Sequence, residues 1–119
     1  MNKVLVVDDE IDICLLVTKQ LQTMGFDASY ALSIKDALSK VSTVQYNLFF
    51  IDLNLTDGSG YDLLQSLQDL KINSKIIVIS AYDSEAKKAI QKGANLFLAK
   101  PFTKSSISES LLKLNFSIS

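Results

Sequence analysis

The sequence predicts an α/β fold in which helices cover both faces of a five-stranded parallel sheet. Short apolar segments of strand length alternate five times with segments whose apolar residues recur at helical spacing. Strict alternation is typical of a parallel sheet, because right-handed crossovers cover each face in turn. The segment "KIIVIS" is apolar almost throughout, which indicates a strand that is buried on both faces.

The first strand-helix unit occupies residues 3–25. "KVLVV" at 3–7 is an apolar cluster of strand length. The segment after it has apolar residues at helical spacing, and Gly25 marks its end because glycine readily adopts the conformation that closes a helix. The stripe of this helix that we expect to face the core consists of Ile13, Leu16, Val17, Leu21 and Met24.

The second and third units are marked by a cap and by a glycine-containing loop. A short strand over 26–31 leads to Ser33, which is a suitable N-cap for a helix over 34–41. "NLFFID" at 47–52 is the third strand, and after the loop a helix runs from about residue 61 to residue 70. The apolar positions of this third helix are Leu63, Leu64 and Leu67.

The last two units contain the most apolar strand and the end of the chain. "KIIVIS" at 75–80 is the fourth strand, Ser84 is a suitable cap for the next helix, and Gly93 marks its end. "NLFLA" at 95–99 is the fifth strand. The apolar positions of the final helix are Ile107, Leu111, Leu112 and Leu114.

Length and composition limit the classes of protein to consider. A chain of 119 residues suits one domain, so we expect residues 1–119 to form a single one. One cysteine cannot form an intramolecular disulfide, and no signal-peptide pattern or membrane-length apolar run is visible, so we expect a cytoplasmic protein without membrane contact. All 12 basic residues are lysines, so direct nucleic-acid reading through bidentate guanidinium contacts is not expected.

Charged and polar residues stand where four of the predicted strands end. Asp8 and Asp9 follow the first strand, and Asp52 ends the third. Ser80 ends the fourth strand, and Lys100 follows the fifth. The carboxyl ends of parallel strands meet at one crevice, where an all-oxygen acidic cluster suits Mg²⁺ and a lysine and a hydroxyl can hold phosphoryl oxygens. The sequence therefore predicts phosphoryl chemistry with Asp52 as the nucleophile.

Four motifs in this order resemble those of the receiver domain of two-component response regulators. They are "VLVVDDE", "FFIDLNLTDGSG", "IIVISAY" and "GANLFLAKPF", and the resemblance covers nearly the whole chain. It implies a flavodoxin-like receiver architecture with the strand order 2-1-3-4-5. It also implies that Asp52 accepts a phosphoryl group from the phosphohistidine of a partner histidine kinase or phosphotransfer protein, in a Mg²⁺-dependent reaction.

The resemblance implies a set of metal ligands and a type of activity. Asp9 and Asp52 would bind Mg²⁺ directly, Asp8 mainly through water, and Asn54 through its main-chain carbonyl. The domain would promote only its own phosphorylation and dephosphorylation, and so would be a signalling domain rather than an enzyme. The sequence identifies no downstream protein target.

The resemblance also implies a switch. The hydroxyl of Ser80 would move to the phosphoryl group, the ring of Phe97 would turn inward, and Lys100 would pair with the phosphoryl oxygens. The surface formed by the fourth strand, the fourth helix and the fifth strand would change as a result. The bond between Lys100 and Pro101 is expected to be cis, as in the family.

Two alternative functions share part of this pattern. "DLNLT" at 52–56 resembles the DxDxT motif of haloacid-dehalogenase-type phosphatases, but Asn54 cannot serve as their general acid and base, and the motifs occur here in the reverse order. A flavodoxin-like flavin-binding module is the other alternative. It would need a loop rich in Ser, Thr and Gly after the first strand, where Asp8 and Asp9 would instead repel a phosphate.

A second apolar set lies on the first helix, away from the predicted core stripe. It consists of Ile11, Cys14 and Leu15, with Thr18 completing the helical spacing. Exposed apolar clusters usually mark an interaction site, and this one follows directly after the acidic pair. In the family that the chain resembles, this helix packs on the helical bundle that presents the phosphohistidine, so we expect the kinase to dock here.

Overall fold

The computed structural model describes residues 2–118 and contains one five-stranded parallel sheet. Its strands are β1 (Lys3–Val7), β2 (Asp27–Ala31), β3 (Leu48–Asp52), β6 (Lys75–Ser80) and β7 (Leu96–Ala99). They lie in the order β2-β1-β3-β6-β7 and all pairs are parallel. Because β6 and β7 are the fourth and fifth strands of this sheet, the expected order 2-1-3-4-5 is confirmed. Two short antiparallel strands, β4 (Asn54–Leu55) and β5 (Gly58–Ser59), follow β3 directly.

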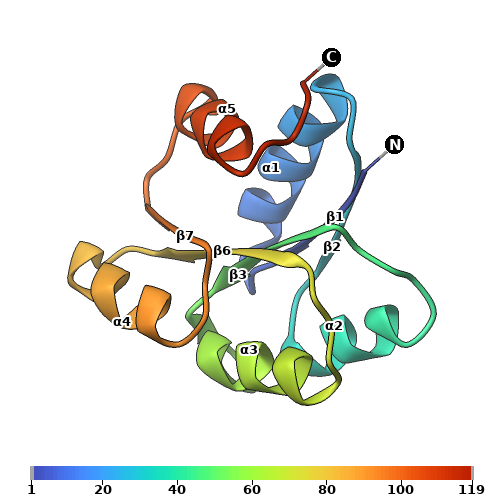
Figure 1. Cartoon of the computed structure of the whole chain (residues 1–119), viewed down its shortest axis with the longest axis vertical. Coiled ribbons are helices and arrows are strands. Elements are labelled where there is room, and N and C mark those ends of the chain that lie inside the picture. Colours follow the sequence, from blue (N-terminus) through green and yellow to red (C-terminus); the bar gives the residue numbers. More distant parts are fainter. Residues whose placement is uncertain (1, 119) are drawn as a thin grey trace.

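Helices cover both faces of the sheet, as Figure 1 shows. They are α1 (Ile11–Thr23), α2 (Ile34–Val41), α3 (Gly60–Asp69), α4 (Ala86–Gln91) and α5 (Lys104–Lys113), with a 3-10 turn η1 (Asp83–Glu85) before α4. One face carries α1 and α5, and the other carries α2, α3 and α4. Within residues 2–118, no helix combines the length and apolarity that crossing a bilayer requires.

The core is divided into two layers by the alternation of side chains along the strands. In β1, Leu5 and Val7 point into the layer under α2, α3 and α4, whereas Val4 and Val6 point into the layer under α1 and α5. After its first residue, β6 is buried throughout, as its apolar sequence predicts. The two apolar layers fix the sheet from both sides, and so hold the strand ends in place.

Helix ends agree with the sequence signals, with one exception. The side chain of Ser33 accepts a hydrogen bond from the backbone N–H of Asp36, as expected of an N-cap. Gly25 and Gly93 follow α1 and α4 with φ of 95° and 113°, a region that favours glycine. The prediction that Ser84 caps the fourth helix is wrong, because Ser84 lies inside η1 and the N-terminus of α4 has no side-chain cap.

The buried face of α1 differs from the predicted stripe. Leu16 is 51% exposed, whereas Cys14 and Thr18 are buried together with Val17 and Leu21. Both faces have helical spacing and share Val17 and Leu21, so periodicity alone could not choose between them. Thr18 can be buried because its hydroxyl donates a 2.7 Å hydrogen bond to the carbonyl of Cys14.

A similar rotation occurs at α5. Leu112, which was expected in the core, is 58% exposed, whereas Ile107 and Leu111 are buried as predicted. Ser110 occupies the buried face instead, where its hydroxyl donates to the carbonyl of Ser106 at 2.8 Å. A small hydroxyl residue with a local backbone acceptor thus replaces a leucine against the sheet.

Candidate functional site

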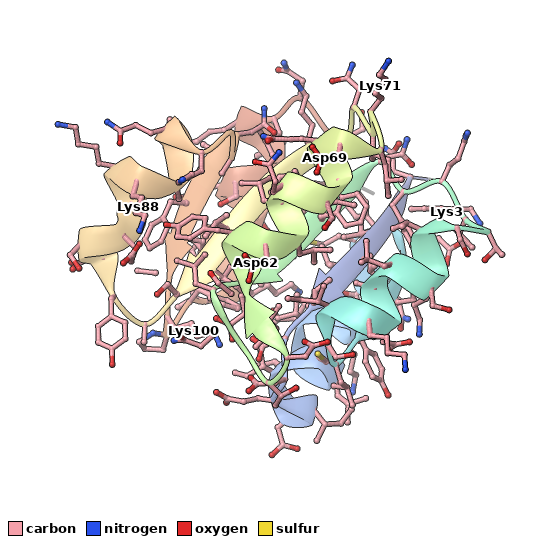
Figure 2. All side chains as sticks on the ribbon, turned by 90° about the horizontal axis from the view of Figure 1, so that it is seen from below. Lys3, Asp62, Asp69, Lys71, Lys88 and Lys100 are labelled. Atoms are coloured by element: carbon pink, nitrogen blue, oxygen red, sulfur yellow. The ribbon has the colours of Figure 1, made fainter. Side chains whose placement is uncertain are left out.

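Three of the predicted site residues meet at the carboxyl edge of the sheet. The side-chain amine Nζ of Lys100 lies 2.8 Å from Asp8 Oδ2 and 3.3 Å from Asp52 Oδ2. Asp8 follows β1, Asp52 ends β3 and Lys100 follows β7, and the parallel register brings these ends together. Figure 2 shows Lys100 at this edge and Lys71 at the opposite one.

The charges at this edge are largely removed from water. Asp8 is fully buried and Asp52 is 3% exposed. Burial, followed by the nearby negative charge of Asp8, raises the pKa of Asp52 to about 6 despite the opposing charge of Lys100. Burial acts to lower the pKa of Lys100, but its contacts with Asp8 and Asp52 outweigh this effect and raise it. At neutral pH the site therefore holds a protonated lysine beside the ionised carboxylate of Asp52.

The loop after β3 packs closely against Asp52. The N–H of Asn54 donates to Asp52 Oδ1 at 3.4 Å, and the N–H of Gly60 donates to the carbonyl of Leu53 at 2.9 Å. A Cβ atom at Gly60 would overlap the backbone carbonyl of Asp52, so only glycine fits where α3 begins. The side chain of Ser59 caps α3 directly before this contact.

The acidic residues after β1 offer oxygen ligands with few competing donors. Carboxylate oxygens of Asp8, Asp9 and Glu10 lie within 4.8 Å of one another. The N–H of Glu10 donates to Asp8 Oδ1 at 3.0 Å, but among the described residues no donor meets the buried Asp8 Oδ2 with hydrogen-bond geometry, although Lys100 pairs with it. Hard divalent cations such as Mg²⁺ prefer clustered carboxylate oxygens, so these residues fit such an ion.

The other predicted residues lie on the neighbouring strands. Ser80 ends β6 and is buried, and its hydroxyl oxygen accepts a 3.1 Å hydrogen bond from the N–H of Tyr82. Phe97 is half-buried in β7 and packs on the core layer under α2, α3 and α4. Asn54 is exposed in β4 beside Asp52. The peptide bond before Pro101 is cis, as expected.

The predicted docking set on α1 needs one correction. Ile11 is 40% exposed and Leu15 is 51% exposed, and the equally exposed Leu16 joins them. Cys14, however, is fully buried, and its thiol donates to the backbone carbonyl of Asp8 at 3.3 Å. It belongs to the buried face of the helix, so its assignment to an exposed patch is wrong. We call Ile11, Leu15 and Leu16 the α1 patch.

Sequence spacing did not indicate two tertiary contacts beside the site. The carboxylate of Asp57 accepts hydrogen bonds from the N–H groups of Ile34 at 2.9 Å and Lys35 at 3.0 Å, and so joins the loop after β3 to the start of α2. The first of these bonds is the main reason that the pKa of Asp57 is lowered. The hydroxyl of Tyr61 in α3 donates to Glu85 Oε2 at 2.8 Å. These partners are far apart in the sequence and meet only in the folded chain.

Comparison with known proteins identifies the family. A sequence model described as the response regulator receiver domain matches residues 4–112. The chain belongs to this family. The receiver domain is 37% identical over 102 residues to the response regulator protein PilR of Pseudomonas aeruginosa, a match that covers 84% of this chain and 23% of PilR. It is 33% identical over 114 residues to the sensory transduction protein LytT of Enterococcus faecalis, covering 92% of this chain and 46% of LytT. The chain thus spans from about a quarter to about half of the length of these relatives.

Solved structures share the fold of the receiver domain. The receiver domain of the Francisella response regulator 1452 has a TM-score of 0.88 at 28% identity, with 96% of each chain covered. The response regulator protein TrrA from Thermotoga maritima, solved in complex with Mg²⁺-BeF, has a TM-score of 0.86 at 29% identity, with 96% of this chain and 99% of TrrA covered. The chain is therefore a flavodoxin-like phosphoacceptor domain of two-component signalling, and the comparisons give no support to a phosphatase or a flavin-binding module.

Proposed function

We propose that Asp52 is the residue that accepts the phosphoryl group in this domain. The observation that carries the proposal is the position of Lys100 Nζ between the buried carboxylates of Asp52 and Asp8. Such a lysine can hold a phosphoryl oxygen next to the attacking carboxylate. With a pKa of about 6, Asp52 is ionised near neutral pH and so can act as a nucleophile.

The proposed step is an in-line transfer from the phosphohistidine of a partner protein. A carboxylate oxygen of Asp52 attacks phosphorus, a P–O bond forms as the P–N bond breaks, and the leaving imidazole takes the electron pair and a proton. Lys100 offsets the charge on the transferred group. The N–H of Asn54 and the amine of Lys100 contact one oxygen each of the Asp52 carboxylate and so orient it, which lowers the entropic cost of the reaction.

We also propose that Mg²⁺ is the cofactor of this reaction. Asp9 and Asp52 would hold the ion directly, Asn54 through its main-chain carbonyl, and Asp8 mainly through water. Bound there, Mg²⁺ supplies positive charge to the oxygens of the transferred group. The acidic cluster after β1 and the Mg²⁺-BeF complex of TrrA support this assignment.

Phosphorylation is proposed to change the surface formed by β6, α4 and β7. The hydroxyl of Ser80 leaves the N–H of Tyr82 and binds the phosphoryl group, and the ring of Phe97 turns inward. The bound group thereby shifts an existing equilibrium between two arrangements of this region. The half-buried position of Phe97 in β7 is compatible with such a movement.

The proposed partner is a histidine kinase or a phosphotransfer protein that docks on the α1 patch. These three residues form an exposed apolar surface on the helix that begins beside the acidic cluster. We propose that the domain works in the cytoplasm as a single unit over residues 1–119, without direct nucleic-acid binding. Its only reactions would be its own phosphorylation and dephosphorylation.

Labelling by a small phosphodonor tests the assignment of Asp52. With acetyl phosphate and Mg²⁺, the wild-type chain should gain one acid-labile phosphoryl group, and Asp52→Asn should gain none. Asp69→Asn, at an exposed acid on α3, is the matched control and should label like the wild type. Full labelling of Asp52→Asn would show that another residue is the acceptor.

A further inference from the structure

We propose that Tyr61 is a positioning residue of the switch, and that its hydrogen bond to Glu85 holds the segment after β6 in the unphosphorylated arrangement. This inference rests on the proposed roles of Asp52 and Ser80. It goes beyond them because it assigns a restraint on switching to a residue outside the phosphorylation site.

A series of hydrogen bonds connects the hydroxyl of Ser80 to α3. The N–H of Tyr82 donates to Ser80 Oγ at 3.1 Å, and the N–H of Glu85 donates to the carbonyl of Tyr82 at 3.1 Å. The hydroxyl of Tyr61 then donates to Glu85 Oε2 at 2.8 Å. These bonds link the Ser80 hydroxyl to Tyr61 through residues 82–85.

Tyr61 also contacts α4 itself. The amine of Lys88 lies 5.2 Å from the centre of the Tyr61 ring, within the range of a cation–π contact. Lys88 stands on the part of α4 that faces α3 (Figure 2). One side chain on α3 thus holds both η1, through Glu85, and α4, through Lys88.

The surroundings of Tyr61 favour its protonated form. Burial, with the hydrogen bond and charge of Glu85 as further causes, raises the pKa of Tyr61 to about 12. The phenol therefore remains protonated and remains a donor.

Most side chains of this segment are not buried. Of its residues, η1 buries none and α4 buries only Ala89. A hollow of about 390 Å³ adjoins the segment and is lined in part by Asn54, Ser80 and Tyr82. The segment therefore has space to move, and Tyr61 ties it to α3 together with Gln68, whose side-chain amide donates to the carbonyl of Lys92 at 3.0 Å.

Phosphorylation and the Tyr61 contact accordingly act against each other. When Ser80 binds the phosphoryl group, the N–H of Tyr82 loses its acceptor, and displacement of the turn stretches the bond between Tyr61 and Glu85. Tyr61→Phe removes this bond and keeps the ring that Lys88 contacts. Because this hydrogen bond opposes the movement in the wild type, the variant should bind a phosphoryl mimic about fivefold more tightly.

The test is titration of the full chain with beryllium fluoride in Mg²⁺, followed by the amide NMR signals of residues 80–88. Tyr61→Phe and Glu85→Ala should each bind about fivefold more tightly than the wild type. Glu85→Gln keeps an oxygen acceptor and should bind more nearly like the wild type. Tyr30→Phe, in the edge strand β2, is the matched control and should leave affinity unchanged.

The results separate this inference from the proposed function. If the wild type binds the mimic and Asp52→Asn does not, the proposed function is supported. If Tyr61→Phe and Glu85→Ala then both bind the mimic no more tightly than the wild type, the role of Tyr61 is overturned. No binding by the wild type overturns both. If Tyr61 had a purely structural role, the variants would have a lower free energy of unfolding but would not bind the mimic more tightly.

Discussion

Replacing Asp52 with Asn should make the folded domain more stable at alkaline pH. The pKa of this carboxyl is raised from 3.8 to about 6, chiefly by burial and then by the charge of Asp8. Ionised Asp52 therefore destabilises the folded state relative to the unfolded one. A shift of about 2 pKa units corresponds to about 3 kcal/mol, because each unit is about 1.4 kcal/mol. Asp52 is only 3% exposed, so solvent screening removes little of this.

The pH dependence gives this prediction its sign. Because the folded pKa is raised, the wild type loses stability as pH rises from about 4 to about 6, and the loss is complete above that range. Asp52→Asn lacks this titration. Its free energy of unfolding should exceed that of the wild type by about 3 kcal/mol near pH 8, which corresponds to roughly 10 °C in Tm. This difference should shrink towards pH 4.

Urea unfolding in EDTA measures this difference without metal binding. The wild type and Asp52→Asn are compared near pH 8 and near pH 4.5, with Asp69→Asn as a control for loss of an exposed acid. Equal stability near pH 8 would refute the argument that Asp52 is a strained buried charge. If the variant were more stable than the wild type by the same amount at both pH values, ionisation of Asp52 could not be the cause.

Two further predictions concern docking and the loop after β3. Leu15→Lys should slow transfer from the kinase more than tenfold by inserting a charge into the α1 patch, while labelling by acetyl phosphate stays normal. Leu70→Lys, at an exposed leucine after α3, is its control, and equal kinase rates for Leu15→Lys and the wild type would contradict the docking site. Gly60→Ala should cost about 2 kcal/mol of unfolding free energy, measured in urea, because its methyl group overlaps the carbonyl of Asp52. A loss below about 0.5 kcal/mol would mean that the loop adapts freely.

The sequence predicted the parts of the site that depend on strand ends. Asp8, Asp52 and Lys100 were recognised because a parallel sheet brings the carboxyl ends of its strands to one edge, and the ion pairs confirm that these residues meet. The link from Tyr61 to Glu85 could not be predicted, because its partners are 24 positions apart and their contact depends on side-chain directions.

The rotation of α1 has a different cause. Two apolar faces share Val17 and Leu21, so the hydrophobic pattern was satisfied by either one. The choice depended on whether Thr18 could be buried, and its hydrogen bond to the carbonyl of Cys14 makes this possible. Such local satisfaction of a hydroxyl group is not visible in the apolar pattern alone.

Chemical mapping of the phosphoryl group tests the central claim most directly. The chain is phosphorylated with acetyl phosphate and Mg²⁺ and then treated with borohydride, which reduces an aspartyl phosphate to homoserine. Peptide mass spectrometry locates the product. Homoserine at Asp52, and only after phosphorylation, is the result that our account predicts. Homoserine at Asp8 or Asp9, or an unmodified Asp52 in a chain that carries the phosphoryl group, would contradict it.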